Sequence, residues 1–199
     1  HIIDKTIGQF DKRFNILISE NSKNKSFKKN IEDNYLNCKV YLIGKNLGVS
    51  YAVNHSLQKV KSKYVLFLRP DVTLFKNSLK KLYLALNNNP RIAIISARDL
   101  NSKIEKLYGF IPEIKNNFYK KANLKFADWV LGGALLINMK HLSKIGLLDK
   151  NFFLDYEEID LCVRARKLNF DVLLFLHFFF GIIFILYLNW IGKSNYFWF

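Results

Sequence analysis

Short apolar runs alternate with helical patterns over the first half of the chain. Apolar runs that end in polar turns are typical of buried strands, and they cover residues 15–19, 38–43, 64–68 and 92–96. Apolar side chains recur at helical spacing over residues 48–60 and 78–88, while the polar residues 23–34 fit either a loop or a solvated helix. This alternation predicts an α/β domain with a mostly parallel central sheet.

The second half of the chain is less regular. Residues 99–125 are basic and have no clear period, which predicts a long loop or a hairpin. An apolar segment at 129–137 is interrupted by Gly132 and Gly133, and residues 157–168 have the pattern of a helix with an acidic start. In parallel sheets ligands bind beyond the carboxyl ends of the strands. The polar residues that follow the strands are therefore the first candidates for a site.

The charge balance indicates an anionic partner. Among 199 residues, 31 are Lys or Arg and 16 are Asp or Glu, which gives a net charge of +15. Such a balance fits nucleic acid, a membrane surface or a phosphorylated substrate. Lys, Asn and Phe have A/T-rich codons and are abundant, so part of the excess reflects codon usage. The Lys residues are dispersed and no recognition motif is present, so we expect no nucleic-acid partner.

Several kinds of site are excluded by what the sequence lacks. Cys38 and Cys162 are far apart, which argues against a disulfide framework or a structural zinc site. No two histidines have the spacing of metal ligands. The chain also has no P-loop, no dinucleotide glycine fingerprint and no nucleophilic serine elbow.

Acidic residues can carry chemistry at two places. Asp71 follows a strand and a proline, where a carboxylate either holds a divalent cation or begins a turn. Glu157 and Glu158 open the last predicted helix, where acidic residues also stabilise the helix dipole. Glu158 shares a helix face with small apolar residues, and a half-buried carboxylate can act as a general base. The residues alone leave both interpretations open.

Two glycine-containing segments are further candidates. The turn formed by Asn46, Leu47 and Gly48 leads into a helix. Such a turn either presents N–H groups to a diphosphate or is an ordinary connection. Gly132 and Gly133 either allow a ligand to approach the backbone closely or form a strand bulge.

These segments occur in a specific order. The chain reads Glu20-Asn21-Ser22, Asn46-x-Gly48-x(5)-Asn54, Leu68-Arg69-Pro70-Asp71, Trp129-Val130-Leu131-Gly132-Gly133-Ala134, Gly146-x-x-Asp149-x-x-Phe152-Phe153 and Glu157-Glu158-x-Asp160-Leu161-Cys162-x-Arg164. In this order and spacing the sequence resembles the family 2 inverting glycosyltransferases. Bacterial members that build surface polysaccharide, including rhamnosyltransferase-like enzymes, are the nearest in pattern. The resemblance covers about residues 15–171.

The resemblance implies a Rossmann-like GT-A fold for residues 1–171. It also implies a nucleotide-sugar donor, a saccharide or lipid-linked acceptor and a Mg²⁺ or Mn²⁺ cofactor held by Asp71. Glu158 would be the base on the acceptor hydroxyl, with Glu157 beside it. The donor-binding residues would be Glu20, Asn46, Gly48, Arg69, Asp71, Gly132 and Gly133.

Three features depart from the family pattern. The usual first strand has no counterpart in residues 1–10, so the N-terminus of the domain is expected to be incomplete. Arg69 stands where Asn or Asp is usual, and its charge would either oppose a metal ion or bind the diphosphate. Glu158 replaces the commoner Asp, which moves the carboxylate by about one bond length.

Residues 172–199 form a hydrophobic C-terminal segment whose composition differs from that of the basic chain before it. Residues 172–192 carry no charged side chain and are long enough to cross a bilayer as a helix. Three interpretations are open: a membrane anchor, a tail from a disrupted reading frame, and a buried core element. An anchor would hold a cytoplasmic enzyme at the anionic inner face of the cytoplasmic membrane. A disrupted frame would make the chain an inactive remnant. A separate alternative is a membrane-tethered interaction protein that keeps the fold but does not bind a nucleotide sugar.

Overall fold

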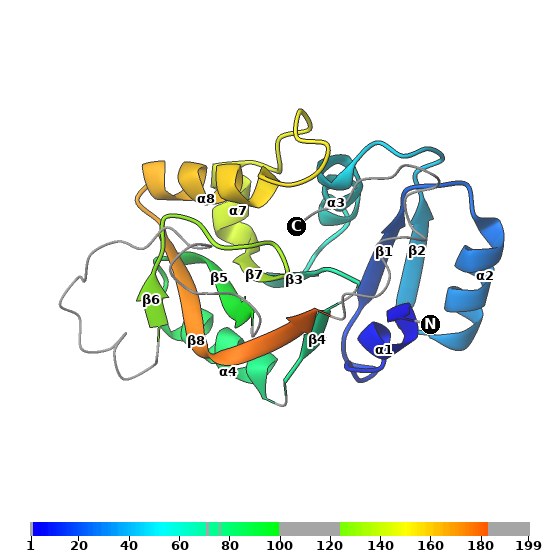
Figure 1. The fold of residues 1–199 in the computed structure, drawn as a ribbon, viewed down its shortest axis with the longest axis horizontal. Helices are drawn as coiled ribbons and strands as arrows, with labels where there is room; N and C mark the ends of the chain where they lie inside the picture. The colour runs from blue at the N-terminus through cyan, green and yellow to red at the C-terminus, as the bar shows by residue number, and fades with distance from the viewer. Residues whose placement is uncertain (1, 71, 76, 100–123, 183–199) are drawn as a thin grey trace.

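The chain folds into helices packed on two β-sheets (Figure 1). The computed structural model describes residues 2–70, 72–75, 77–99 and 124–182. The helices are α1 (Ile2–Ile7), α2 (Lys25–Asn34), α3 (Val49–Leu57), α4 (Ser78–Asn88), α7 (Met139–Ile145) and α8 (Glu157–Lys167). The strands are β1 (Ile16–Glu20), β2 (Cys38–Leu42), β3 (Tyr64–Leu68), β4 (Val72–Leu74), β5 (Ile92–Asp99), β6 (Leu124–Phe126), β7 (Ala134–Asn138) and β8 (Asp171–Ile182). The predicted α/β class is confirmed.

Most elements lie where the hydrophobic pattern predicts them. The four predicted strands are β1, β2, β3 and β5, and the predicted helices are α3, α4 and α8. The polar segment 23–34 forms helix α2, which begins after Asn24 because the side chain of Asn24 accepts a hydrogen bond from the Phe27 N–H. Most of the predicted loop or hairpin at 99–125 lies outside the described residues. Helix α1 has no counterpart among the predicted elements.

The larger sheet is mixed in direction. Its described strands run in the order β3-β7-β5-β8-β4, and β6 also pairs with β8. Only β5 and β8 are parallel there, whereas β1 and β2 form a separate parallel pair. The expectation of a mostly parallel sheet is therefore wrong for the larger sheet. Strand β7 enters between β3 and β5 and runs antiparallel to both, and β4 and β6 run antiparallel to β8.

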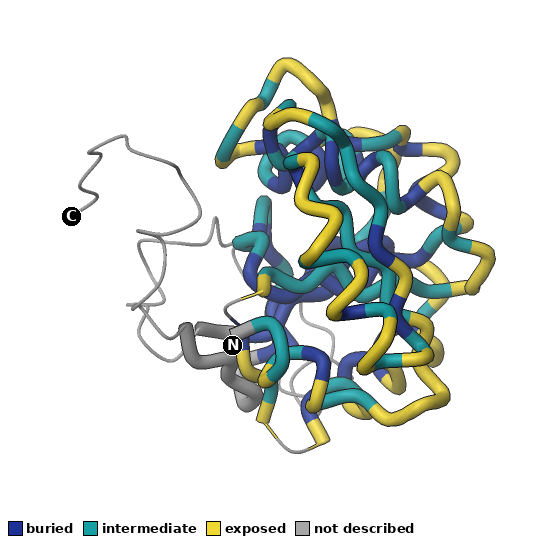
Figure 2. The backbone as a smooth tube through the Cα atoms, turned by 90° about the vertical axis from the view of Figure 1, so that its right-hand side faces the viewer, coloured by how far each residue is buried: buried dark blue, intermediate teal, exposed yellow. Residues whose placement is uncertain are grey.

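Two cores lie on opposite faces of the larger sheet. Alternate residues of β7 and β8 point to opposite sides, because successive side chains of a strand alternate. Leu135, Ile137, Val172 and Leu174 pack in the core with α7 and α8, whereas Ala134, Leu136, Leu173 and Phe175 pack in the core with α4. The helices accordingly lie on both sides of this sheet (Figure 1). The buried segments run through the interior of the molecule (Figure 2).

The start of the hydrophobic C-terminal segment belongs to the larger sheet. Residues 172–182 continue β8, so the predicted boundary at residue 172 falls within a strand, and residues 172–175 are buried. This first part of the predicted membrane span is a strand instead of a helix. Residues 183–199 lie outside the described residues. Within the described part of the chain, no helix has the length and apolar content that a bilayer crossing requires.

Candidate functional site

The candidate site begins with two buried carboxylates at the start of α8. Asp155 and Tyr156 precede this helix in the left-handed conformation, with φ of 63° and 70°. The helix then begins at Glu157, and its first turn holds both Glu157 and Glu158. Only 5% of Glu157 and 8% of Glu158 is exposed to solvent. Buried carboxylates are rare unless they are paired or functional, so this pair requires an explanation.

Glu158 is held against the backbone at Gly132. The Gly132 N–H donates a hydrogen bond to Glu158 Oε1 at 3.2 Å. A Cβ atom at position 132 would lie 3.4 Å from both Cδ and Oε1 of Glu158, at the near limit of ordinary van der Waals contact, so the carboxylate lies directly against this glycine. Among the described residues Glu158 Oε2 has no hydrogen-bond partner. One oxygen is therefore held by the backbone, while the other is buried without a hydrogen-bond partner in the described part of the chain, as is typical of a functional carboxylate.

Burial makes both carboxylates weaker acids than usual. Desolvation raises the pKa of Glu157 to about 7, with smaller upward contributions from the charges of Glu158 and Asp155. Desolvation also raises the pKa of Glu158, and Asp155 adds to it. The positive charge of Arg69 lowers the pKa of both groups. A carboxylate with a pKa near 7, as in Glu157, exchanges protons near neutral pH.

Arg69 joins this group from the end of β3. Its backbone N–H donates to the Gly133 carbonyl at 3.1 Å. Ser96 on β5 supports the same segment, because its hydroxyl donates to the Leu131 carbonyl at 3.3 Å. The structure therefore brings together five predicted site residues that lie far apart in the sequence: Arg69, Gly132, Gly133, Glu157 and Glu158.

A second group lies where β1 ends and α3 begins. Glu20 is the last residue of β1 and is half-buried. Asn21 follows it and is buried; its side-chain amide donates to the Gly48 carbonyl at 3.0 Å and accepts from the Leu47 N–H at 3.4 Å. Asn46 Oδ1 accepts from the Gly48 N–H at 3.1 Å. Sequence reasoning gave Asn21 no separate role, although an Asn directly after a strand is a common turn-forming residue.

The turn before α3 is not a ready-made anion site. Its three consecutive N–H groups already have acceptors within the protein: Asn21 Oδ1, Asn46 Oδ1 and the Phe153 carbonyl oxygen. These three N–H groups therefore already form hydrogen bonds, and binding of a diphosphate by this turn stays a prediction. Donor binding by Glu20 and by the side chain of Asn46 stays a prediction.

Gly48 connects the second group to the first. It has φ of 85°, and a Cβ atom there would lie 2.5 Å from the Phe153 carbonyl oxygen and 2.9 Å from the Phe153 ring. The next N–H, that of Val49, donates to the Phe153 carbonyl at 2.8 Å. Phe153 precedes the two carboxylates on the same loop. The role of Gly48 is thus to let this loop pack on the start of α3.

Two further side chains hold the loop before α8. The Asn54 amide donates to the Leu148 carbonyl at 2.7 Å and accepts from the Leu148 N–H at 3.0 Å. Arg164 donates to the carbonyls of Ile145 and Leu147, at 2.7 and 2.9 Å, and its Nε donates to Asp160 at 2.8 Å. Asp160 and Arg164 lie four residues apart on α8 and also form an ion pair.

A bound metal stays a prediction. Asp71, the predicted ligand, lies outside the described residues. Among the residues that the structure describes, no group of three or more His, Cys, Asp or Glu side chains is arranged to hold an ion. The fit of a metal ion to this chain is therefore not demonstrated by the described side chains.

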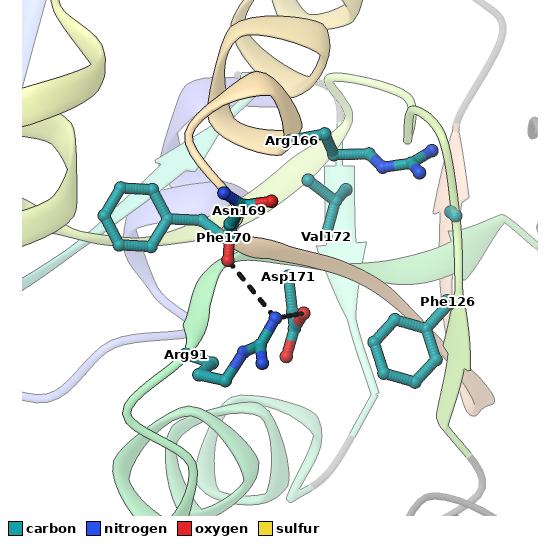
Figure 3. A pocket seen from close by; sticks show the side chains of 8 residues that line it. Arg91, Phe126, Arg166, Asn169, Phe170, Asp171 and Val172 are labelled. Carbon is teal, nitrogen blue, oxygen red and sulfur yellow. Dashed lines mark hydrogen bonds and ion pairs between the residues drawn. The ribbon is translucent and has the colours of Figure 1, made fainter. Parts of the chain in front are cut away.

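A small pocket of about 170 Å³ lies at the opposite end of α8 (Figure 3). Its lining includes Arg91, Arg166, Asn169 and Asp171, and none of the predicted site residues. Arg91 contacts the Asn169 carbonyl at 3.4 Å and Asp171 at 3.6 Å, and Arg166 forms an ion pair with Asp128. Both arginines thus already have protein partners, so we place the candidate site at the carboxylates and not here.

Comparisons with known proteins identify the family to which the chain belongs. The profile described as Glycosyl transferase family 2 matches residues 1–144. The chain is 30% identical over 145 residues to the low-salt glycan biosynthesis hexosyltransferase Agl10 of Haloferax volcanii. That match covers 66% of this chain and 45% of the relative, so the chain spans less than half of that protein.

Solved structures resemble the fold at low sequence identity. GalNAc-T7 with UDP, GalNAc and Mn²⁺ superposes with a TM-score of 0.70 at 13% identity, over 90% of this chain and 40% of that one. S. aureus TarS 1–349 superposes with a TM-score of 0.65 at 14% identity, over 90% and 56%. The Pyrobaculum calidifontis mannosyltransferase PcManGT with GDP-Man and Mn²⁺ gives 0.57 at 12% identity, over 86% and 49%. These neighbours have the GT-A fold, and the predicted GT-A fold is confirmed.

Proposed function

The chain belongs to glycosyl transferase family 2, and we propose that it transfers a sugar with inversion from a nucleotide-diphosphate donor to a saccharide or lipid-linked acceptor. Its relative Agl10 is a hexosyltransferase, and its structural neighbours were solved with UDP, UDP-GlcNAc or GDP-Man. Family membership does not favour the alternatives of a nucleic-acid-binding module or an inactive remnant. The observation that carries the proposal is the buried Glu158 carboxylate on Gly132.

Glu158 acts as the general base in this proposal. Its Oε2 removes the proton of the acceptor hydroxyl while the acceptor oxygen attacks the anomeric carbon of the donor. The bond between that carbon and the diphosphate oxygen breaks in the same step, and the nucleoside diphosphate leaves with both electrons. Gly132 keeps Oε1 in place, so the base does not have to reorganise during the step. A single displacement inverts the anomeric carbon.

The donor side of the proposal includes a divalent cation. GalNAc-T7 and PcManGT were solved with Mn²⁺, which supports Mn²⁺ or Mg²⁺ for this chain. Asp71 would hold the ion, which supplies positive charge for the leaving diphosphate. Arg69 adds a fixed positive charge near the same carboxylates. Gly132 and Gly133 would line the pocket between donor and acceptor, and Glu20, Asn46 and Gly48 would lie on the nucleotide side.

A pair of conservative variants tests the base. We expect Glu158→Gln to lower the transfer rate by about a hundredfold or more, since general bases contribute about 10²–10⁴. Nucleotide-sugar binding, measured by calorimetry with UDP-GlcNAc and GDP-Man, should change less than about twofold. Glu157→Gln removes a carboxylate with similar burial and is the matched control, with a smaller loss. Wild-type transfer by Glu158→Gln would refute the proposed base.

We also propose that the glycosyltransferase domain works in the cytoplasm at the inner face of the cytoplasmic membrane. The net charge of +15 supports this location, since basic surfaces associate with anionic lipids. Sedimentation with vesicles of phosphatidylglycerol should carry the protein down at low salt, whereas phosphatidylcholine vesicles should not. Equal recovery with the two lipids would contradict the proposed attraction.

A further inference from the structure

Two large aromatic side chains are exposed directly before the carboxylates. Phe153 is 56% exposed and Tyr156 is 64% exposed, although both lie on the loop that packs against α3. This loop extends from α7 to α8 and comes close to α3 (Figure 1). Single exposed hydrophobic residues are common, but exposed apolar side chains grouped beside a functional site are typical of a binding surface. We refer to Phe153 and Tyr156 as the aromatic rim.

The exposure of the rim is not caused by a loose loop. The Phe153 carbonyl is bound by the Val49 N–H, and one side of the residue packs on Gly48. Leu148, earlier on the loop, is held at both its N–H and its carbonyl by Asn54, which is 2% exposed. The backbone is therefore anchored at two points, while more than half of each aromatic residue stays exposed to solvent.

The backbone at Tyr156 supports the same conclusion. Asp155 and Tyr156 are consecutive residues with positive φ, and neither is glycine. This conformation costs about 1 kcal/mol or more per residue and concentrates at functional sites. Tyr156 is the N-cap of α8, yet its side chain makes no capping hydrogen bond. Helix capping therefore does not explain why a tyrosine occupies this position.

We propose that the aromatic rim binds a pyranose ring of the acceptor. The inference rests on the proposed function, because Glu158 must then contact the acceptor hydroxyl, and Tyr156 lies two residues before it. One face of a pyranose ring carries mainly C–H groups, which pack on an aromatic ring, while its hydroxyls stay at the edge. The rim therefore favours a saccharide acceptor over one that offers only a lipid phosphate.

Acceptor kinetics test the rim. With methyl glycosides of common hexoses as acceptors, we expect Phe153→Ala and Tyr156→Ala each to raise the acceptor KM about tenfold, which corresponds to about 1.4 kcal/mol. Tyr156→Phe should keep the wild-type KM, because stacking needs the ring and not the hydroxyl. Phe14→Ala, which removes another exposed aromatic side chain, is the matched control. Nucleotide-sugar affinity should stay unchanged in all four variants.

A second readout does not need turnover. Saturation-transfer NMR with the same glycosides should show contact with wild-type protein and a loss of that signal in the double variant Phe153→Ala/Tyr156→Ala. The inference is overturned by an unchanged signal and KM in the double variant, by weaker nucleotide-sugar binding, or by no glycoside contact with the wild type. It is also overturned if the rim variants change only self-association. If Glu158→Gln loses transfer while the rim variants behave as wild type, only the rim is refuted.

Discussion

At the scale of single residues, the site depends on acidic groups that the fold keeps out of water. Glu157 and Glu158 each have a side-chain oxygen with no hydrogen-bond partner among the described residues. Such groups cost stability, and proteins retain them mainly where a reaction uses them. Stability and catalysis should therefore depend on pH in opposite ways.

The first prediction concerns stability. Glu157 has a pKa near 7 in the folded protein, against 4.5 for an ordinary glutamate. Below about pH 4.5 the Glu157 carboxyl is protonated in both the folded and the unfolded protein. As the pH rises toward 7, the unfolded chain loses this proton while the folded protein keeps it. The free energy of unfolding should therefore fall over this range. We expect Glu157→Gln to raise it by up to about 3 kcal/mol at about pH 8 and to leave it almost unchanged at about pH 4.

Urea titrations at the two pH values measure this difference. Glu32 is the control, because the hydrogen bond from the Val40 N–H lowers its pKa and its effect on stability should change with pH in the opposite direction. Glu32→Gln should destabilise the protein more at high pH than at low pH. An equal effect of Glu157→Gln at both pH values would contradict the burial explanation.

The second prediction concerns Arg69. Its charge lowers the pKa of both Glu157 and Glu158. Without this charge Glu158 keeps its proton to a higher pH. The acid limb of the kcat/KM profile should therefore move to higher pH in Arg69→Ala. Arg69→Lys should retain the wild-type limb. If the limb does not move in Arg69→Ala, the cation does not act on the base.

At the scale of elements, the contact between the turn before α3 and the loop before α8 joins the two halves of the site. Gly48 and Phe153 meet there, and Asn54 and Leu148 add a second contact nearby. Each depends on residues about a hundred positions apart. The geometry of the carboxylates should therefore be sensitive to changes on α3, which itself carries none of the predicted site residues.

The third prediction compares two glycines. Gly44 and Gly48 both have positive φ, 90° and 85°, but a Cβ atom at Gly44 would meet nothing within 4 Å. Gly44→Ala should therefore lower the free energy of unfolding by about 1 kcal/mol, which is the cost of placing a residue with a Cβ at positive φ. Gly48→Ala should cost about 2 kcal/mol more and should lower transfer, because its Cβ would displace Phe153. Thermal unfolding measures both variants, and equal losses would show that the Phe153 contact is unimportant.

At the scale of the whole molecule, the two sheets have cores of unequal size. The β1–β2 sheet packs with α1 and α2 around four buried hydrophobic residues: Ile7, Ile31, Cys38 and Val40. The larger sheet is covered on both faces by much larger cores. No pairing joins β1 or β2 to a described strand of the larger sheet.

The fourth prediction follows from this difference. Regions with little buried apolar area open at a lower free energy than the rest of a protein. The amides of β1 and β2 should therefore exchange with solvent faster than those of β5 and β7, by about tenfold or more. Hydrogen exchange under native conditions measures both sets. Equal protection would show that the two sheets open as one unit.

Local sequence determined most of the elements and the identity of the candidate base. Strand and helix periods depend on neighbouring residues, so β1, β2, β3, β5, α3, α4 and α8 were predictable. The ordered motifs also indicated the family and singled out Glu157 and Glu158. Composition could not distinguish a strand of the sheet from a membrane span at residues 172–182, because an apolar run of this kind fits both.

Tertiary structure alone decided which residues meet. The hydrogen bond from Gly132 to Glu158, the fit of Gly48 against Phe153 and the Asn54 contact with Leu148 join segments with no shared sequence period. The antiparallel insertion of β7 likewise depends on the path of the chain. The raised pKa values come from burial, which is a property of the packed molecule. The sequence thus supplied the reactive groups, and packing decided their environment.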